Sequence, residues 1–208
     1  MKRLSSSLIQ QMLRSATRMS VFIVVAILVL TATYQMTQAP IEQAKQSALL
    51  RSLSQVMPEH HYDNALTQDT RQVKDARLAT DQAVTVYRAR KDGQPAGLVI
   101  PAVTDQAYAP GMKILVGLNA DRQIIGVRAI EHQETPGLGD KIEPEKSDWI
   151  HTFKGKTLET PPPQQWTVKK YGGQFDQFSG ATITPKAVVE KVKAVLQFAE
   201  ERGARLYD

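Results

Sequence analysis

The sequence contains no cysteine among its 208 residues. This absence excludes disulfides, thiolate metal sites, iron–sulfur clusters and haem attached through cysteine. Any electrons that the protein handles must therefore travel on another kind of group. Histidine is scarce as well: His60 and His61 are adjacent, which suits one metal ion poorly, and His132 and His151 have no His or Cys nearby. We therefore expect no metal site.

Acidic residues are absent from the first 38 positions, although this stretch holds four basic residues, Lys2, Arg3, Arg14 and Arg18. The formal net charge of +5 comes almost wholly from them, because the remainder has 22 Lys and Arg against 21 Asp and Glu. Binding to a phosphate backbone requires clustered basic residues. The near-neutral remainder therefore predicts no nucleic-acid partner.

Charged residues of both signs are missing between Met19 and Ile41, and residues 21–30 are wholly apolar. Such a run is long enough to cross roughly 30 Å of hydrocarbon, so we predict a basic tail at 1–18 and a single transmembrane helix at 19–38. A cleaved signal peptide is the competing interpretation, but Pro40 directly follows the small-residue site and should obstruct cleavage. The basic tail places the N-terminus in the cytoplasm. In a bacterium, the rest would lie in the periplasm, anchored in the inner membrane.

Beyond the span, the pattern predicts an α+β fold. Pro40 opens a helical stretch that ends before Pro58, and residues 39–82 form a helix and linker whose part from 59 to 82 is irregular with room for a short strand. Residues 83–208 form the exported domain. Its apolar runs predict two hairpins and a mainly antiparallel sheet. The paired segments are 84–90 with 97–103 and 113–118 with 123–131, and a further strand is expected at 166–170.

The start of the final helix allows two interpretations. Pro185 suits the first helical position, which would make Thr184 the N-cap, and Gly203 would end the helix. On the first interpretation Thr184 only satisfies a free backbone N–H group. On the second, the helix N-terminus binds a phosphate, or a hydroxyl there is esterified by one, because free N–H groups and the helix dipole favour an anion.

The residues before this helix resemble the flavinylation motif of exported FMN-binding domains: Asp176-x-x-Ser179-Gly180-Ala181-Thr182-x-Thr184. In that family the last threonine is joined to FMN by a phosphodiester that a dedicated flavin transferase installs. The resemblance implies covalent FMN on Thr184. It implies that the other five fixed residues surround the phosphate and serve recognition.

A second stretch, from Glu131 to Ile142, resembles the loop that lies beside the flavin in the same domains. The resemblance makes Glu134, Thr135 and Leu138 further candidates for cofactor binding. Without a ligand, the stretch would be a solvated Gly/Pro loop; it lacks the third glycine of a dinucleotide fingerprint, and no helical pattern follows. Trp149 could stack on the isoalloxazine or lie in the core.

The N-terminal span, the length and the segments 114–117 (Ile-Leu-Val-Gly) and 168–173 (Val-Lys-Lys-Tyr-Gly-Gly) resemble the G subunits of the Rnf electron-transport complexes, so the similarity covers nearly the whole chain. The resemblance implies a membrane-anchored flavoprotein that relays electrons within an ion-translocating oxidoreductase, with other subunits, the flavin transferase and the lipid bilayer as partners. Since the flavin performs the redox step, we expect no catalytic acid–base pair or nucleophile acting on a substrate. Two alternatives remain: the related C subunit of a sodium-pumping NADH:quinone reductase, and a cofactor-free anchored periplasmic scaffold.

Overall fold

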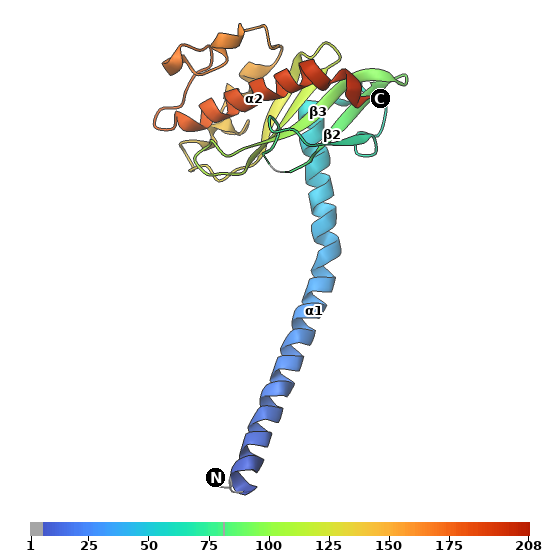
Figure 1. The fold of residues 1–208 in the computed structure, drawn as a ribbon, viewed down its shortest axis with the longest axis vertical. Coiled ribbons are helices and arrows are strands. Elements are labelled where there is room, and N and C mark those ends of the chain that lie inside the picture. Colours follow the sequence, from blue (N-terminus) through green and yellow to red (C-terminus); the bar gives the residue numbers. More distant parts are fainter. Residues whose placement is uncertain (1–5, 81) are drawn as a thin grey trace. The chain divides into compact units, whose positions relative to one another are not determined.

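The computed structural model describes residues 6–80 and 82–208, and it confirms the α+β fold (Figure 1). The chain has two units, one ending at Ala48 and a compact one from Leu49 to Asp208. Lys2 and Arg3, two of the four basic residues of the predicted tail, lie outside the described residues. The compact unit includes residues 49–82, which lie before the predicted start of the domain at residue 83. The predicted domain boundaries stay predictions.

The first element is helix α1, Ser6–Val56, and among the described residues it is the one helix long and apolar enough to cross a membrane. Its apolar side chains are exposed: Phe22 keeps 75% of its surface accessible and Leu30 keeps 69%. The hydroxyls of Thr31 and Thr33 donate to the carbonyls of Ile27 and Val29, at 2.7 and 2.8 Å. These bonds hide the polar groups, as a hydrocarbon environment requires.

The prediction that a separate helix opens at Pro40 is wrong, because α1 continues through this residue to Val56. Proline lacks the N–H that would bond to the carbonyl four residues earlier, and in a soluble helix this loss usually breaks the element. The apolar periodicity on both sides and the long run of good helix formers outweigh that loss here.

Five antiparallel strands form one sheet in the order of the sequence. They are β1 (Thr70–Val73), β2 (Val84–Lys91), β3 (Gln94–Thr104), β4 (Met112–Asn119) and β5 (Ile124–Glu131). Both predicted hairpins are confirmed, and β1 is the short strand within the otherwise irregular 59–82 region. The β2–β3 turn is tight, with Asp92 and Gly93 at φ of 51° and 76°, as the Asp-Gly pair favours.

Each face of the sheet is covered by a helix. Helix α2 (Ile183–Arg202) packs on one face, where Leu98 and Ile100 of β3 join the main core with Val192 and Leu196 of the helix. The other face receives the last turns of α1, from Leu49 to Val56. Successive side chains of a strand point to opposite faces of the sheet, so neighbouring residues enter different cores. This alternation suits a sheet that is covered on both sides.

A pair of glycines lets the end of α1 approach the sheet closely. Gly117 on β4 is paired with Gly126 on β5, and a Cβ added to Gly117 would lie 2.1 Å from the carbonyl oxygen of Val56. A Cβ on Gly126 would be 3.1 Å from the Val56 Cα. The missing side chains leave the space in which the α1 backbone crosses these two strands.

We expect Gly117→Ala to destabilise the domain by about 1–3 kcal/mol, because the added methyl group overpacks this crossing. Amide hydrogen exchange should show reduced protection around Val56. The control is Gly111→Ala, whose φ of +82° makes it strained but which has no heavy atom within 4 Å of the new Cβ. That variant should lose stability without loosening the end of α1; equal loosening in both would contradict the packing argument.

The chain between β5 and α2 is built from short 3-10 helices, Asp140–Ile142, Asp148–Phe153, Pro163–Gln165 and Lys169–Tyr171. The strand predicted at 166–170 is wrong. Val168 makes a single bridge, to Phe175, and the chain turns at once through Gly172, at φ of 82°. The apolar side chains that suggested a strand instead feed an aromatic cluster of the core. Its members are Trp149, Phe153, Trp166, Phe175 and Phe178.

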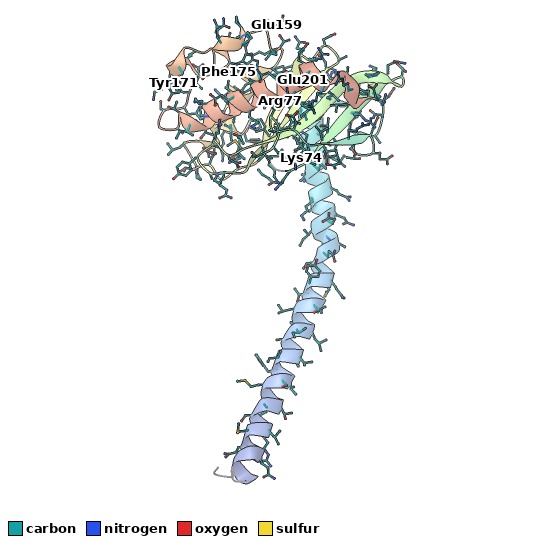
Figure 2. The ribbon with its side chains drawn as sticks, in the orientation of Figure 1. Lys74, Arg77, Glu159, Tyr171, Phe175 and Glu201 are labelled. Carbon is teal, nitrogen blue, oxygen red and sulfur yellow. The ribbon has the colours of Figure 1, made fainter. Side chains whose placement is uncertain are left out.

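The segment after β1 is held to the C-terminal part of α2 by Arg77, which Figure 2 labels together with Glu201. The Arg77 guanidinium lies 2.8 Å from Asp75 and 2.7 Å from Glu201. The hydrogen bonds from Arg77 lower the pKa of Asp75 to about 2. This end of α2 is therefore anchored, and the site described next lies at its other end.

Candidate functional site

Helix α2 begins earlier than the sequence predicted. Its N-cap is Thr182 and Ile183 is the first helical residue, so Thr184 and Pro185 occupy the second and third positions. The first helical bond runs from the Lys186 N–H to the Thr182 carbonyl, 3.3 Å. Pro185 is tolerated because the first N–H groups of a helix have no partner within it. The prediction that Thr184 is the N-cap is therefore wrong. Gly203 ends the helix, as predicted.

The hydroxyl of Thr184 is turned inward instead of capping the helix. Its side chain is 1% exposed, and Oγ1 donates a short hydrogen bond to Oε2 of Glu134. Glu134 is itself buried, with 7% of its surface exposed, and its Oε1 accepts from the backbone N–H of Tyr108 at 3.2 Å. Two motifs fifty residues apart in the sequence thus meet at one hydroxyl.

The loop that carries Glu134 folds over Thr184 as a tight turn. The N–H groups of Leu138 and Gly139 both donate to the carbonyl of Thr135, at 3.1 and 3.2 Å. Gly137 has a φ of +79°, a conformation that glycine adopts without strain. A Cβ on Gly139 would lie 2.2 Å from Oε2 of Glu134 and 2.9 Å from Oγ1 of Thr184. A side chain at position 139 would force this pair of side chains to shift.

The remaining candidate residues lie around this centre. Thr135 and Leu138 are exposed, Leu138 at 42%. Ser179 and Gly180 are exposed, while Ala181 and Thr182 are half-buried. Gly180, at φ of +81°, faces the loop, since a Cβ there would be 3.3 Å from the Cδ2 atom of Leu138. The structure therefore brings the loop after β5 against the turn before α2.

Asp176 is the predicted motif residue whose side chain lies away from Thr184. Its carboxylate pairs with Lys169 at 2.6 Å, and both side chains are exposed. Its carbonyl accepts a hydrogen bond from the indole N–H of Trp149, 2.8 Å. Trp149 is 6% exposed and packs edge-on against Phe153 and Phe178. Of the two interpretations of Trp149, the structure supports the core residue.

An acidic and basic cluster beneath the loop was missed by the sequence reasoning, which treated Glu134 and Asp140 as parts of a solvated loop. Asp140 is 3% exposed, and its Oδ2 lies 2.8 Å from Nζ of Lys146. Lys146 also bonds to Glu143, whose carboxylate is 3.3 Å from Nε2 of His132. His132 in turn accepts the backbone N–H of Glu134 through Nδ1, 3.3 Å. The cluster fixes both ends of the loop.

The Lys146 hydrogen bond, aided by a backbone N–H from Gly137, holds the pKa of Asp140 below its usual value. A lowered folded pKa stabilises the domain above the carboxyl pKa of the unfolded chain, near 3.9. That contribution is lost as pH falls through the folded pKa. We expect Asp140→Asn and Lys146→Met each to flatten the drop in melting temperature below about pH 4. A D140N curve parallel to the wild-type curve would contradict this assignment.

A surface groove of about 250 Å³ opens beside the first turn of α2. Two of the residues that line it are apolar: Tyr171, labelled in Figure 2, is 56% exposed, and Ile183 is 59% exposed. Thr182 adds a hydroxyl, and Lys186 adds a cation that is paired with Glu190 of the same groove at 2.7 Å. The groove therefore presents both apolar and polar groups beside the first turn of α2.

Comparison with known proteins gives a consistent result. The chain matches the sequence pattern of the FMN-binding domain over residues 108–197, a range that includes both Glu134 and Thr184, and that of the RnfG N-terminal region over residues 1–56. It is 42% identical over 188 residues to the G subunit of the ion-translocating oxidoreductase complex of Aliivibrio fischeri (strain ATCC 700601 / ES114), with 90% of each chain covered. The G subunit of the same complex from Vibrio cholerae serotype O1 (strain M66-2) is 39% identical over 190 residues, 91% of each chain. That of Shewanella piezotolerans is 40% identical over 195 residues, 93% of this chain and 92% of the relative.

Proposed function

Because the chain belongs to the family of G subunits of ion-translocating oxidoreductase complexes, we propose that it is a membrane-anchored flavoprotein of such a complex. It relays electrons through FMN attached to Thr184 by a phosphodiester. The observation that carries this proposal is the meeting of the two motif segments at the Thr184 hydroxyl. Other subunits of the complex and the lipid bilayer are its partners, and a flavin transferase matures it.

The residues around Thr184 fit a flavin phosphate. Thr184 lies in the first turn of a 20-residue helix, where the helix dipole favours an anion, and the N-cap side chain makes no capping bond to the free N–H groups. Lys186 lies in the groove beside it. Leu138, Ile183 and Tyr171 present the exposed apolar surface that would hold the rings. When bound, FMN supplies the electron-carrying isoalloxazine, which no side chain of this chain can replace.

A covalent bond suits a carrier outside the cytoplasm. A flavin that dissociates there is diluted beyond recovery, whereas a tethered one stays at high effective concentration whatever its affinity. The tether also allows an open site such as this one, since Leu138 and Ile183 are exposed and the groove is shallow. An open site lets an electron donor or acceptor approach the flavin.

The proposal requires the site to open before FMN is attached. Oγ1 of Thr184 is covered by the loop, with Gly139 and Glu134 against it. A phosphorus atom must come within about 3–3.5 Å of the attacking oxygen. The turn from Thr135 to Gly139, exposed up to Leu138, is therefore the part that has to move.

The decisive experiment is the intact mass of the full-length chain, purified after co-expression with a flavin transferase. We expect the sequence mass plus one FMN less one water, and flavin fluorescence that stays with the denatured band in a gel. Chain expressed without the transferase is the control and should be dark. A matured sample that weighs no more than its amino acids would leave the cofactor-free anchored scaffold as the better description.

We further propose that the N-terminus is cytoplasmic and the domain from Leu49 onward periplasmic, as the basic residues before the span indicate. A reporter enzyme that is active only in the periplasm, fused after Asp208, should be active. A reporter that is active only in the cytoplasm should be inactive at the same position. The opposite pattern would reverse the orientation.

A further inference from the structure

We propose that Glu134 is the base that activates the Thr184 hydroxyl when the flavin is attached. The inference rests on the proposed attachment at Thr184 and assigns the proton transfer to this chain, not to the transferase alone. Its starting point is the short hydrogen bond from Oγ1 of Thr184 to Oε2 of Glu134, between two side chains that are 1% and 7% exposed. The acceptor therefore already touches the proton that must leave.

The carboxylate is held in place independently of Thr184. Its second oxygen, Oε1, accepts the backbone N–H of Tyr108 at 3.2 Å, and the Glu134 N–H donates to Nδ1 of His132 at 3.3 Å. These contacts come from two separate segments, the one before β4 and the one directly after β5. The turn from Thr135 to Gly139 can therefore lift from Thr184 while the Glu134 carboxylate stays beside the hydroxyl.

A purely structural role explains the glutamate poorly. Among the described residues, none of the ion pairs includes Glu134, although a buried carboxylate without a cation is costly. The N-terminal end of α2 offsets part of that cost. A glutamine would accept the same hydroxyl proton as a hydrogen bond without placing a charge in the interior. A carboxylate can take up a proton, which the amide of a glutamine cannot, and a general base requires this capacity.

The attachment step forms one bond to phosphorus and breaks another. Oγ1 of Thr184 bonds to the phosphorus of the FMN half of flavin adenine dinucleotide, which the transferase presents, and the pyrophosphate bond from that phosphorus to AMP breaks. AMP is the leaving group. The hydroxyl proton passes to Oε2 of Glu134. The carboxyl group is then neutral, so that it can donate a hydrogen bond to the new phosphodiester and the two groups do not repel each other as anions.

The test uses the full-length chain in detergent with purified transferase, flavin adenine dinucleotide and magnesium. Labelling is followed by intact mass over time and over a range of pH. We expect Glu134→Gln to lower the maximal labelling rate at least about 100-fold, with little change in the chain concentration that gives half that rate. E134Q should label with a weaker dependence on pH than the wild type.

Two further variants keep the result interpretable. Glu200→Gln removes an exposed carboxylate that pairs with Arg122 and contacts neither Glu134 nor Thr184, and it should label at close to the wild-type rate. Glu134→Ala should be slow and should recover with added formate, which a purely structural defect would not do. If folded E134Q labels like wild type, or if formate fails to rescue E134A, the base assignment is overturned while attachment stands. Unlabelled wild type would instead overturn the proposed function.

Discussion

Thr184→Ala is expected to leave the chain without covalent flavin under conditions that load the wild type completely. The substitution removes the only oxygen that the proposal allows to form the phosphodiester. Intact mass and in-gel fluorescence measure the loss. Thr184→Ser keeps a hydroxyl and should still load, at a reduced rate, because the missing methyl group leaves its rotamer less fixed.

Peptide mapping provides the sharper control for Thr184. Fragmentation of the flavin-bearing peptide should place the added mass on Thr184 and not on Ser179 or Thr182, which lie nearby and are more accessible. Stability must be measured too. T184A leaves Oε2 of Glu134 buried without its donor, which costs about 1–3 kcal/mol. Complete unfolding would mean that the loss of flavin says nothing about attachment, and T184S would then decide.

Gly139→Val is expected to abolish loading although it lies outside the motif before α2. The new Cβ would stand 2.2 Å from Oε2 of Glu134 and 2.9 Å from Oγ1 of Thr184, so the two side chains could not keep their contact. Overpacking should also lower the free energy of unfolding by about 1–3 kcal/mol. The labelling time course and a denaturant titration measure both effects in one preparation.

Gly137 provides a control two residues away in the same turn. Its φ is +79°, and no heavy atom lies within 4 Å of an added Cβ. Gly137→Ala should therefore lose stability through backbone strain, about 1–2 kcal/mol, and still accept flavin. If G137A and G139V lose labelling equally, general loosening of the turn explains both, and the contact argument fails.

The parts of the fold that depend on local patterns were predictable from the sequence. The apolar span needs only its own composition, and the hairpins follow from alternating residues around turn signals such as Asp92-Gly93. The segment at Trp166 was not predictable in this way. Its apolar residues look like a strand, but their partners are aromatic side chains such as Phe153 and Phe175, which lie beyond the reach of a local pattern within the segment.

The candidate site was predictable as a set of residues but not as a geometry. The resemblance of two short motifs drew attention to Glu134 and Thr184, and the structure brings them together. The expected N-cap role of Thr184 followed correct local rules, since Pro185 suits the start of a helix. A buried carboxylate from the loop after β5 competes for that hydroxyl, and no local rule contains such a partner. The burial of Asp140 was hidden for the same reason, because Lys146 lies beyond the loop.

The closed turn over Thr184 has a consequence for the maturation and assembly of the protein. A phosphate on Oγ1 would need space on the side where Gly139 lies against Thr184 in this structure. If FMN is attached to Thr184 as proposed, copies before and after attachment differ in the outline of this loop. A protein that contacts residues 135–139 would then bind the form with flavin and the form without it differently. Assembly of the complex could in this way depend on flavin attachment without a separate checking protein.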